Sequence, residues 1–156
     1  MRQLMEIAED ARRVKHAVAA LGTNDKNRGL LAIADALLAH ADEIIAANQI
    51  DIENGRASGL NEGLIDRLTL DSKRIAGIAE GCRQVADLPD PIGEVLWMRK
   101  TPNGLNIGEK RVPMGVIGII YEARPNVTVD AAALCFKAGS ACILRGGKEA
   151  FHSSMC

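Results

Sequence analysis

A short basic turn late in the sequence carries the residue types that hold phosphate groups. Arg145 and Lys148 flank Gly146 and Gly147. A guanidinium presents a planar fork of N–H donors that matches phosphate oxygens, and the two glycines let the backbone approach a ligand closely. The spacing by itself also fits an ordinary solvated basic turn, because Gly-Gly pairs are common between elements. These residues are therefore candidates for binding a dinucleotide or another phosphate.

A second candidate segment follows the apolar run at residues 116–120. It contains Arg124, Pro125 and Asn126. Proline suits the first position of a helix, where its missing N–H is not needed, and a helix N-terminus with an arginine beside it attracts anions. The plainer interpretation is a capped helix start. Arg124 and Asn126 are thus candidates for contacts with an anionic substrate.

The thiols and imidazoles give no comparable signal. No pair of cysteines has C-x-x-C spacing, so we expect neither a disulfide framework nor a redox motif. Cys135 and Cys142 lie in apolar stretches, where burial raises the pKa of a thiol and makes it inert. The histidines show no ligand spacing with one another or with cysteine, which predicts no metal site.

The residues that position these segments change character near residue 90. Residues 1–87 read as helices, because apolar side chains recur at i, i+3, i+4 and i+7 from Leu4 onward. Gly22 is the expected stop of the first helix, and Thr23, Asn24 or Asp25 is the expected cap of the second. The sequence further predicts a helix at residues 41–54 ended by Gly55–Gly59, a short helix at 61–68, and another capped by Asp71.

The rest of the sequence reads mainly as strands. Residues 92–112 predict a hairpin that turns at Asn103-Gly104, where both residues tolerate positive φ. Residues 113–156 predict a β-α-β unit, with strands at 114–121 and 141–144 and a helix at 127–138. Ligands of parallel α/β sheets bind beyond the carboxyl ends of the strands. We expect both candidate segments to lie at that edge of the sheet. The order of elements predicts the α/β fold class.

Composition limits the function classes. The 156-residue chain is 47% hydrophobic and only 3% aromatic, with a net charge of -1. This charge gives no electrostatic reason to bind nucleic acid or an anionic membrane. No apolar run approaches the roughly 20 residues that span a bilayer, and the N-terminal residues lack a secretory apolar region. We expect a soluble, cytoplasmic protein of one domain.

Several strings in the sequence closely resemble the gamma-glutamyl phosphate reductases, also called glutamate-5-semialdehyde dehydrogenases. The resemblance covers essentially the whole chain, and Tyr-Glu-Ala-Arg-Pro-Asn is its most specific string. The strings are Thr-Pro-Asn-Gly-Leu at 101–105, Lys-Arg-Val-Pro at 110–113, Tyr-Glu-Ala-Arg-Pro-Asn at 121–126 and Ile-Leu-Arg-Gly-Gly-Lys-Glu-Ala at 143–150. Ala-Ala-Asn at 46–48 and Leu-Ile-Asp-Arg-Leu at 64–68 agree as well.

The resemblance implies a truncated fold of the aldehyde dehydrogenase type. Residues 1–156 would be the N-terminal portion of the cofactor domain, and residues 92–112 the extension that pairs subunits into a homo-oligomer. The catalytic domain and its nucleophilic cysteine would lie beyond this chain, which alone would be inactive. The implied reaction is NADPH-dependent reduction of L-glutamyl 5-phosphate to L-glutamate 5-semialdehyde and phosphate, in L-proline biosynthesis. Association with glutamate 5-kinase is a further implication.

The resemblance also assigns roles to the candidate residues. The position of Arg145 is a lysine in the wider superfamily, where it contacts the adenosine ribose. An arginine there also suits a 2′-phosphate, with Lys148 adding charge, which favours NADPH over NADH. Lys148 itself departs from the small hydroxyl residue usual in the family. Asn126 is the nearest counterpart of the asparagine that stabilises the oxyanion in aldehyde dehydrogenases.

Two other functions remain open on the sequence. One is a stand-alone module that binds a dinucleotide or phosphate, which would fold cooperatively and bind NADPH by itself. The other is a non-catalytic oligomerisation protein built around the hairpin, which would associate but ignore NADPH. The Arg-Gly-Gly turn and the loop at residues 121–126 argue against the second, because pairing of subunits needs neither.

Overall fold

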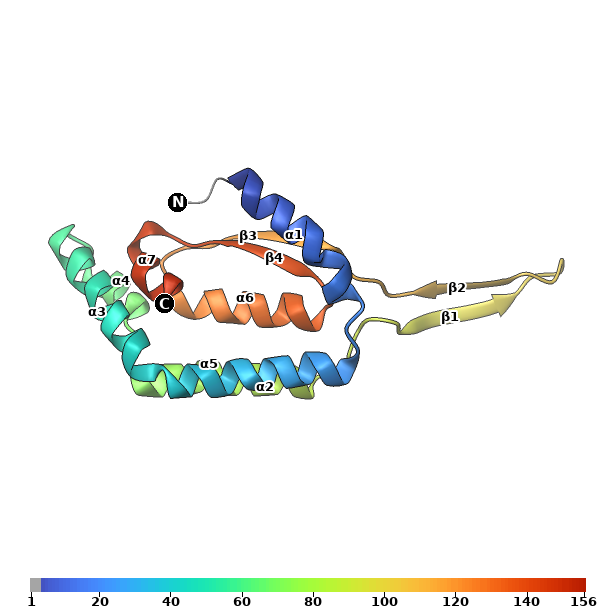
Figure 1. Ribbon diagram of the computed structural model, residues 1–156, viewed down its shortest axis with the longest axis horizontal. Helices are drawn as coiled ribbons and strands as arrows, with labels where there is room; N and C mark the ends of the chain where they lie inside the picture. The colour runs from blue at the N-terminus through green and yellow to red at the C-terminus, as the bar shows by residue number, and fades with distance from the viewer. Residues whose placement is uncertain (1–3) are drawn as a thin grey trace.

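A two-stranded parallel sheet lies between one helix on its first face and a stack of helices on its second, as the computed structural model in Figure 1 shows. The structure describes residues 4–156, so residues 1–3 of the predicted helical segment lie outside it. The elements in chain order are α1 Leu4–Ala19, α2 Thr23–Ala39, α3 Ala41–Ala57, α4 Glu62–Leu68, α5 Ser72–Asp87, β1 Val95–Lys100, β2 Asn106–Lys110, β3 Val116–Ile120, α6 Pro125–Lys137, β4 Ala141–Arg145, the 3₁₀ helix η1 Lys148–Ala150 and α7 Phe151–Met155.

The predicted β-α-β unit is present. β3 and β4 pair in parallel, from Val116 opposite Ala141 to Ile120 opposite Arg145, and α6 connects them. α1 covers one face of this sheet and α6 the other (Figure 1). Arg145 is the last residue of β4 rather than the first residue after it. Its side chain therefore starts at the carboxyl edge of the sheet, as a ligand site requires.

The main core consists of small apolar side chains between α2, α5 and α6. Leu30, Ala34 and Ala79 have no exposed surface, and Cys82, Ala86 and Ala133 complete the cluster. A β-carbon on Gly29 would lie 2.8 Å from the ring of Phe136, so this glycine lets α2 and α6 approach closely. Small residues at helix contacts compensate for the scarcity of aromatic side chains in this chain.

Two predicted helix boundaries differ from those observed. Gly22 occupies the N-cap position of α2 without a side-chain hydrogen bond, so none of the predicted caps is used. The Thr23 hydroxyl donates to Asp90 Oδ2 instead, at 3.0 Å. α3 also continues through Gly55 to Ala57, because that glycine is buried where a β-carbon would lie 3.0 Å from Leu60 and Ile65 side-chain atoms. In contrast, Asp71 caps α5 as predicted, by accepting from the Arg74 amide at 2.7 Å.

The predicted hairpin is an arm that projects from the end of the sheet (Figure 1). β1 and β2 pair antiparallel, and every residue of both strands is exposed. The turn differs from the prediction, because only Gly104 has positive φ, at 89°, and Asn103 does not. Pro102 fixes its own φ near the value for the second position of a type I turn, which leaves the left-handed position to the glycine.

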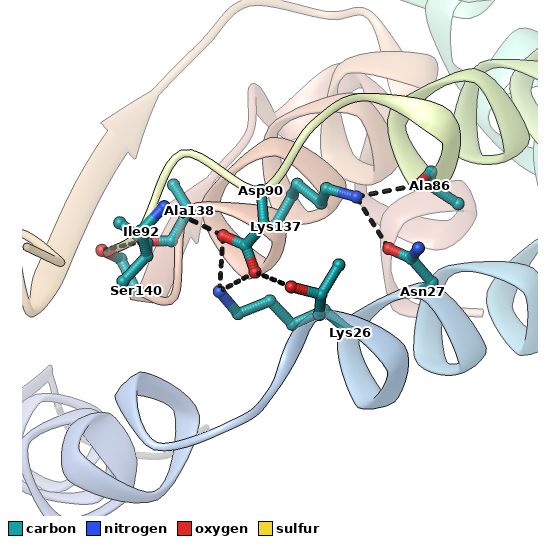
Figure 2. A network of polar contacts seen from close by, with 9 residues as sticks. Lys26, Asn27, Ala86, Asp90, Ile92, Lys137, Ala138 and Ser140 are labelled. Carbon is teal, nitrogen blue, oxygen red and sulfur yellow. Dashed lines mark hydrogen bonds and ion pairs between the residues drawn. The ribbon is translucent and has the colours of Figure 1, made fainter. Parts of the chain in front are cut away.

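Buried charges hold the base of the arm (Figure 2). Lys26 Nζ on α2 lies 3.0 and 2.9 Å from the two carboxylate oxygens of Asp90, and only 1% of the lysine is exposed. Asp90 Oδ1 also accepts from the amide of Ile92. On the returning chain, the Met114 amide donates to Ser140 Oγ at 3.2 Å. Hydrogen bonds thus tie the outgoing end of the arm to α2 and its returning end to Ser140, the residue before β4.

A second buried lysine extends this network. Lys137 Nζ on α6 donates to Asn27 Oδ1 and to the Ala86 carbonyl, each at 2.7 Å. Burial lowers the pKa of Lys137, and its acceptors are neutral groups. Among the described residues, Lys26 is thus the lysine that forms an ion pair with Asp90, and Lys137 is held by neutral acceptors.

We predict that Lys26→Met destabilises the protein more than the double change Lys26→Met, Asp90→Leu. The single change leaves a largely buried carboxylate without its cation, which costs about 3–5 kcal/mol. The double change removes both charges and should restore part of that loss. Urea denaturation of the three proteins gives the comparison.

Arg28→Ala is the matched control, because it breaks an exposed pair with Asp25 on the same helix and should change stability little. Equal losses in the single and double variants would mean that packing of the lysine stem, rather than the ion pair, holds the base of the arm.

Candidate functional site

The two candidate segments meet at the end of the sheet farthest from the arm (Figure 1). The Tyr121 amide donates to the Arg145 carbonyl at 3.1 Å, which continues the β3–β4 pairing by one residue. The loop at residues 121–124 therefore lies beside the turn at residues 145–147. Both line a cavity of about 550 Å³, together with part of α4.

This cavity, called the large cavity below, contains three arginines from different parts of the chain. Arg145 comes from β4, Arg124 precedes α6, and Arg67 lies near the end of α4. Within residues 4–156, none of the three guanidinium groups has a hydrogen bond or ion pair to another side chain. Glu122 and Glu149 also line the cavity. The three arginines outnumber the two glutamates, so the lining of the large cavity carries a small excess of positive charge.

The two glycines of the turn are needed for close contact rather than for an unusual backbone. Neither Gly146 nor Gly147 has positive φ. A β-carbon on Gly146 would lie 3.2 Å from ring atoms of Tyr121, and one on Gly147 would lie 3.2 Å from the Ala123 amide nitrogen and 2.5 Å from Glu149 Oε2. The turn thus packs directly against the neighbouring loop, and a side chain at either position would separate the two walls of the cavity.

The Tyr121 hydroxyl anchors the loop at residues 121–124 to α6. It lies 2.7 Å from Thr128 Oγ1 on α6, and Thr128 Oγ1 lies 3.4 Å from Ser154 Oγ on α7. This chain of hydroxyls connects the loop, α6 and α7. The cavity wall is consequently held by side-chain hydrogen bonds as well as by the sheet.

Two predicted residues lie elsewhere. Asn126 lines a neighbouring cavity of about 420 Å³, the small cavity, and its amide donates to Asp130 Oδ2 on the next turn of α6. Lys148 lines a third cavity with Asp51 and His152, and not the large cavity of Arg145. Of the six predicted site residues, Arg124, Arg145 and Gly147 line one cavity, and Gly146 shapes it through Tyr121.

Sequence reasoning did not single out Arg67 or Glu149 as site residues. Both line the large cavity, and Arg67 lines the small cavity as well. Arg67 stands 78 positions before Arg145 in the sequence, so only the tertiary fold brings them together. Glu149 directly follows the basic turn, and its closeness to that turn was the available signal.

A buried polar network on α3 supports both walls of the large cavity. Asn48 has no exposed surface; its Nδ2 donates to the Leu68 carbonyl at 2.8 Å, and its Oδ1 accepts from the Leu70 amide at 2.7 Å. The same Nδ2 donates to Ser153 Oγ at 2.9 Å. The C-terminal end of α4, the helix that carries Arg67, is thereby joined to α7, which follows the Arg145 turn.

Asp51, one helical turn after Asn48, holds the start of α7. Its carboxylate accepts from the amides of His152 and Ser153, at 3.0 and 2.8 Å, and from the Ser153 hydroxyl at 2.6 Å. His152 Nδ1 lies 2.8 Å from the same carboxylate. Burial by itself would raise the pKa of Asp51, but the hydrogen bonds from Ser153 and His152 outweigh burial and lower it.

Three cysteines in or beside the core, Cys82, Cys135 and Cys142, are unsuited to act as nucleophiles. Burial raises the pKa of Cys82, Cys135 and Cys142 above the ordinary thiol value, so the reactive thiolate is disfavoured at neutral pH. Across residues 4–156, no group of three or more His, Cys, Asp or Glu side chains is placed to hold a metal ion. Among the same residues, no helix is both long and apolar enough to cross a membrane.

We predict that Asp51→Ala loosens α7 selectively. The change removes the acceptor of the His152 and Ser153 amides, so hydrogen exchange at these amides should accelerate about tenfold or more. Exchange at Thr101 in the arm, whose amide donates to the Leu105 carbonyl, should stay the same. Residue-resolved exchange measured by NMR provides the test.

The pH dependence gives a second readout. Because the folded state lowers the pKa of Asp51, its contribution to stability is present above the unfolded value near 3.9 and is lost as the pH falls through the folded value. The variant should lack this part of the acid destabilisation, whereas Asp42→Ala, at an exposed position of α3, should retain it. Uniformly faster exchange along the chain would indicate global destabilisation and contradict a local role.

Comparison with known proteins finds close relatives. The chain is 56% identical over 155 residues to a gamma-glutamyl phosphate reductase of Carboxydothermus hydrogenoformans, which covers 99% of this chain and 37% of the relative. The crystal structure of gamma-glutamyl phosphate reductase from Thermotoga maritima superposes with a TM-score of 0.96 at 42% identity, covering 99% of this chain and 37% of that one. No family model matches the chain.

A more distant structure defines the fold class. A probable aldehyde dehydrogenase from Listeria monocytogenes, at 16% identity, superposes with a TM-score of 0.68 over 96% of this chain and 30% of its own. This likeness shows the fold alone. The chain spans just over a third of the curated relatives it matches, and the resemblance and α/β fold class expected from the sequence are confirmed.

Proposed function

We propose, from the match of this chain to the N-terminal part of gamma-glutamyl phosphate reductases, that it forms the NADPH-binding part of such an enzyme. The proposed reaction is reduction of L-glutamyl 5-phosphate to L-glutamate 5-semialdehyde and phosphate, in L-proline biosynthesis. The observation that carries this proposal is the large cavity at the carboxyl ends of β3 and β4, where Arg145 has no side-chain partner within residues 4–156. Dinucleotides bind at this edge of α/β sheets.

The residues present fit a phosphorylated dinucleotide. Arg145 has a guanidinium without a side-chain partner in residues 4–156, and it projects from the end of a strand. The adjacent turn packs directly against the neighbouring loop through Gly146 and Gly147, which keeps the two walls of the cavity close together around Arg145. Arg145 would bind the 2′-phosphate through charge-assisted hydrogen bonds. When bound, the cofactor supplies the hydride that reduces the acyl carbon.

The roles proposed for this chain are binding and orientation. Arg124 attracts the anionic substrate to the cavity, and Asn126 remains a candidate for contact with it from the small cavity. Attack on the acyl phosphate needs a thiolate, and Cys135 and Cys142 are disfavoured by burial. Following the family resemblance, the proposal assigns the nucleophile to protein outside these 156 residues.

The arm supports a proposal of subunit pairing. Val95, Trp97, Met98 and Ile107 are more than 40% exposed on its two strands. Such apolar side chains on exposed strands favour contact with other protein surface. We place the arm at a homo-oligomer interface of a cytoplasmic enzyme, and association with glutamate 5-kinase belongs to the same proposal.

We predict that Arg145→Ala, in a full-length reductase that carries this chain as its N-terminal part, raises KM for NADPH about ten- to a hundredfold. Charge-assisted hydrogen bonds to a phosphate contribute roughly 1.5–3 kcal/mol each, and NADH lacks that phosphate. KM for NADH should therefore hardly change. Steady-state kinetics with both cofactors measures the difference.

Lys148→Ala provides the comparison within the same turn. If Lys148 also binds the 2′-phosphate, the double variant should lose more affinity for NADPH than either single variant. Its placement in a different cavity from Arg145 favours a small effect. Equal rises in KM for NADPH and NADH in Arg145→Ala would mean that this arginine supports the fold or binds the ribose common to both cofactors. No residue of this chain would then support the assignment of NADPH.

We predict that the 156-residue chain alone has no reductase activity, because burial raises the pKa of Cys82, Cys135 and Cys142 and disfavours the thiolate that the reaction needs. The assay is the reverse reaction with glutamate semialdehyde, phosphate and NADP⁺. Turnover that disappears in Cys135→Ser or Cys142→Ser would contradict the prediction. Cooperative unfolding with tight NADPH binding by this chain would instead favour the stand-alone binding module.

A further inference from the structure

Arg67 has no role in the cofactor site proposed above, yet it faces both cavities. It lies one residue before the end of α4 and lines the large cavity with Arg145 and the small cavity with Asn126. Arg124 is the other arginine that lines both. Arg67 and Arg124 therefore stand where the two cavities adjoin, and they come from different elements on either side.

The backbone that carries Arg67 is held firmly. The neighbouring residue Leu68 is fully buried, and its carbonyl accepts from Asn48. Arg74 donates to the Thr69 carbonyl at 2.7 Å and to Asp66 Oδ1 at 2.7 Å. The turn between α4 and α5 is therefore held by Asn48 on its buried side and by Arg74 on its exposed side. Arg67 directly precedes this turn on α4, so the backbone that carries it is ordered before a ligand binds.

The two aspartates that line the small cavity with Arg67 are already engaged. Asp66 pairs with Arg74, and Asp130 accepts from Asn126. Glu122 and Glu149 line the large cavity, but neither forms an ion pair with Arg67 within residues 4–156. Arg74 is thus bonded to the protein, while Arg67 and Arg124 have no side-chain partner within residues 4–156. This contrast distinguishes an arginine that holds structure from arginines available to a ligand.

We propose that Arg67 and Arg124 together bind the phosphoryl group of the acyl-phosphate substrate, and inorganic phosphate in the reverse direction. This inference rests on the proposed function and adds a residue and a subsite to it. A phosphoryl group carries nearly two negative charges and three acceptor oxygens, which suit two guanidinium forks. A carboxylate has a single charge, for which one fork suffices. Arg145 is left for the cofactor.

The reverse reaction separates the three anions that could occupy this position, because each belongs to a different reactant. Phosphate carries the phosphoryl group, glutamate semialdehyde carries the carboxylate, and NADP⁺ carries the cofactor phosphates. KM is measured for each reactant in a full-length reductase that contains this chain. Arg67→Ala should raise KM for phosphate about ten- to a hundredfold and change the other two less than about threefold. Arg67→Lys, which keeps the charge but not the fork, should lie between.

Arg28→Ala is the matched control, since it removes an exposed arginine of α2 that lines neither cavity. Thermal unfolding should be unchanged in Arg67→Ala, because the side chain has no described partner to lose. Arg124→Ala should repeat the phosphate effect. A rise in KM for the semialdehyde or NADP⁺ in place of phosphate, or no change at all, would overturn the phosphate subsite. Failure of the proposed function itself would appear separately, as a lack of phosphate- and NADP⁺-dependent oxidation by the unchanged enzyme.

Discussion

The buried polar side chains of α3 are the constraint on which the candidate site depends. Asn48 and Asp51 are three residues apart and therefore lie on one face of the helix. Asn48 holds the C-terminal end of α4, which carries Arg67, and Asp51 holds the helix that follows the Arg145 turn. Ser153 bonds to both. A buried amide and carboxylate are costly unless every bond is made, so this arrangement tolerates little displacement of either cavity wall.

Away from that network, the molecule leaves much apolar surface exposed. Its accessible surface is 10111 Å², compared with about 7,600 Å² expected for a compact protein of this mass. The arm contributes both of its faces, and Ile120 at the end of β3 is 80% exposed. The polar ties at Lys26–Asp90 and Met114–Ser140 keep the base of the arm in place without burying its strands. The fold thus separates a well-packed helical core from surfaces suited to further protein contacts.

The sequence predicted the elements whose signals are local. The apolar run at residues 116–120 and the helix after Pro125 gave the parallel unit, and Asp71 gave a correct cap. Predictions failed where distant residues decide the outcome. Thr23 bonds to Asp90 rather than capping α2, and Gly55 stays helical because it packs against Leu60 and Ile65. Asn48 and Asp51 resemble ordinary polar helix residues, since their partners in α7 lie about a hundred positions away.

The same distinction explains which candidate residues share a cavity. Arg145 and Arg124 were both predicted from strand ends, and parallel pairing of the strands brings them together. Lys148 follows Arg145 by only three residues, yet η1 carries it to a different cavity. Arg67 shares the large cavity despite its distance in sequence, because Asn48 joins the end of α4 to α7, which follows the Arg145 turn. Charge at this site is therefore set by how α3 positions its neighbours, and the basic string at residues 145–148 accounts for only part of it.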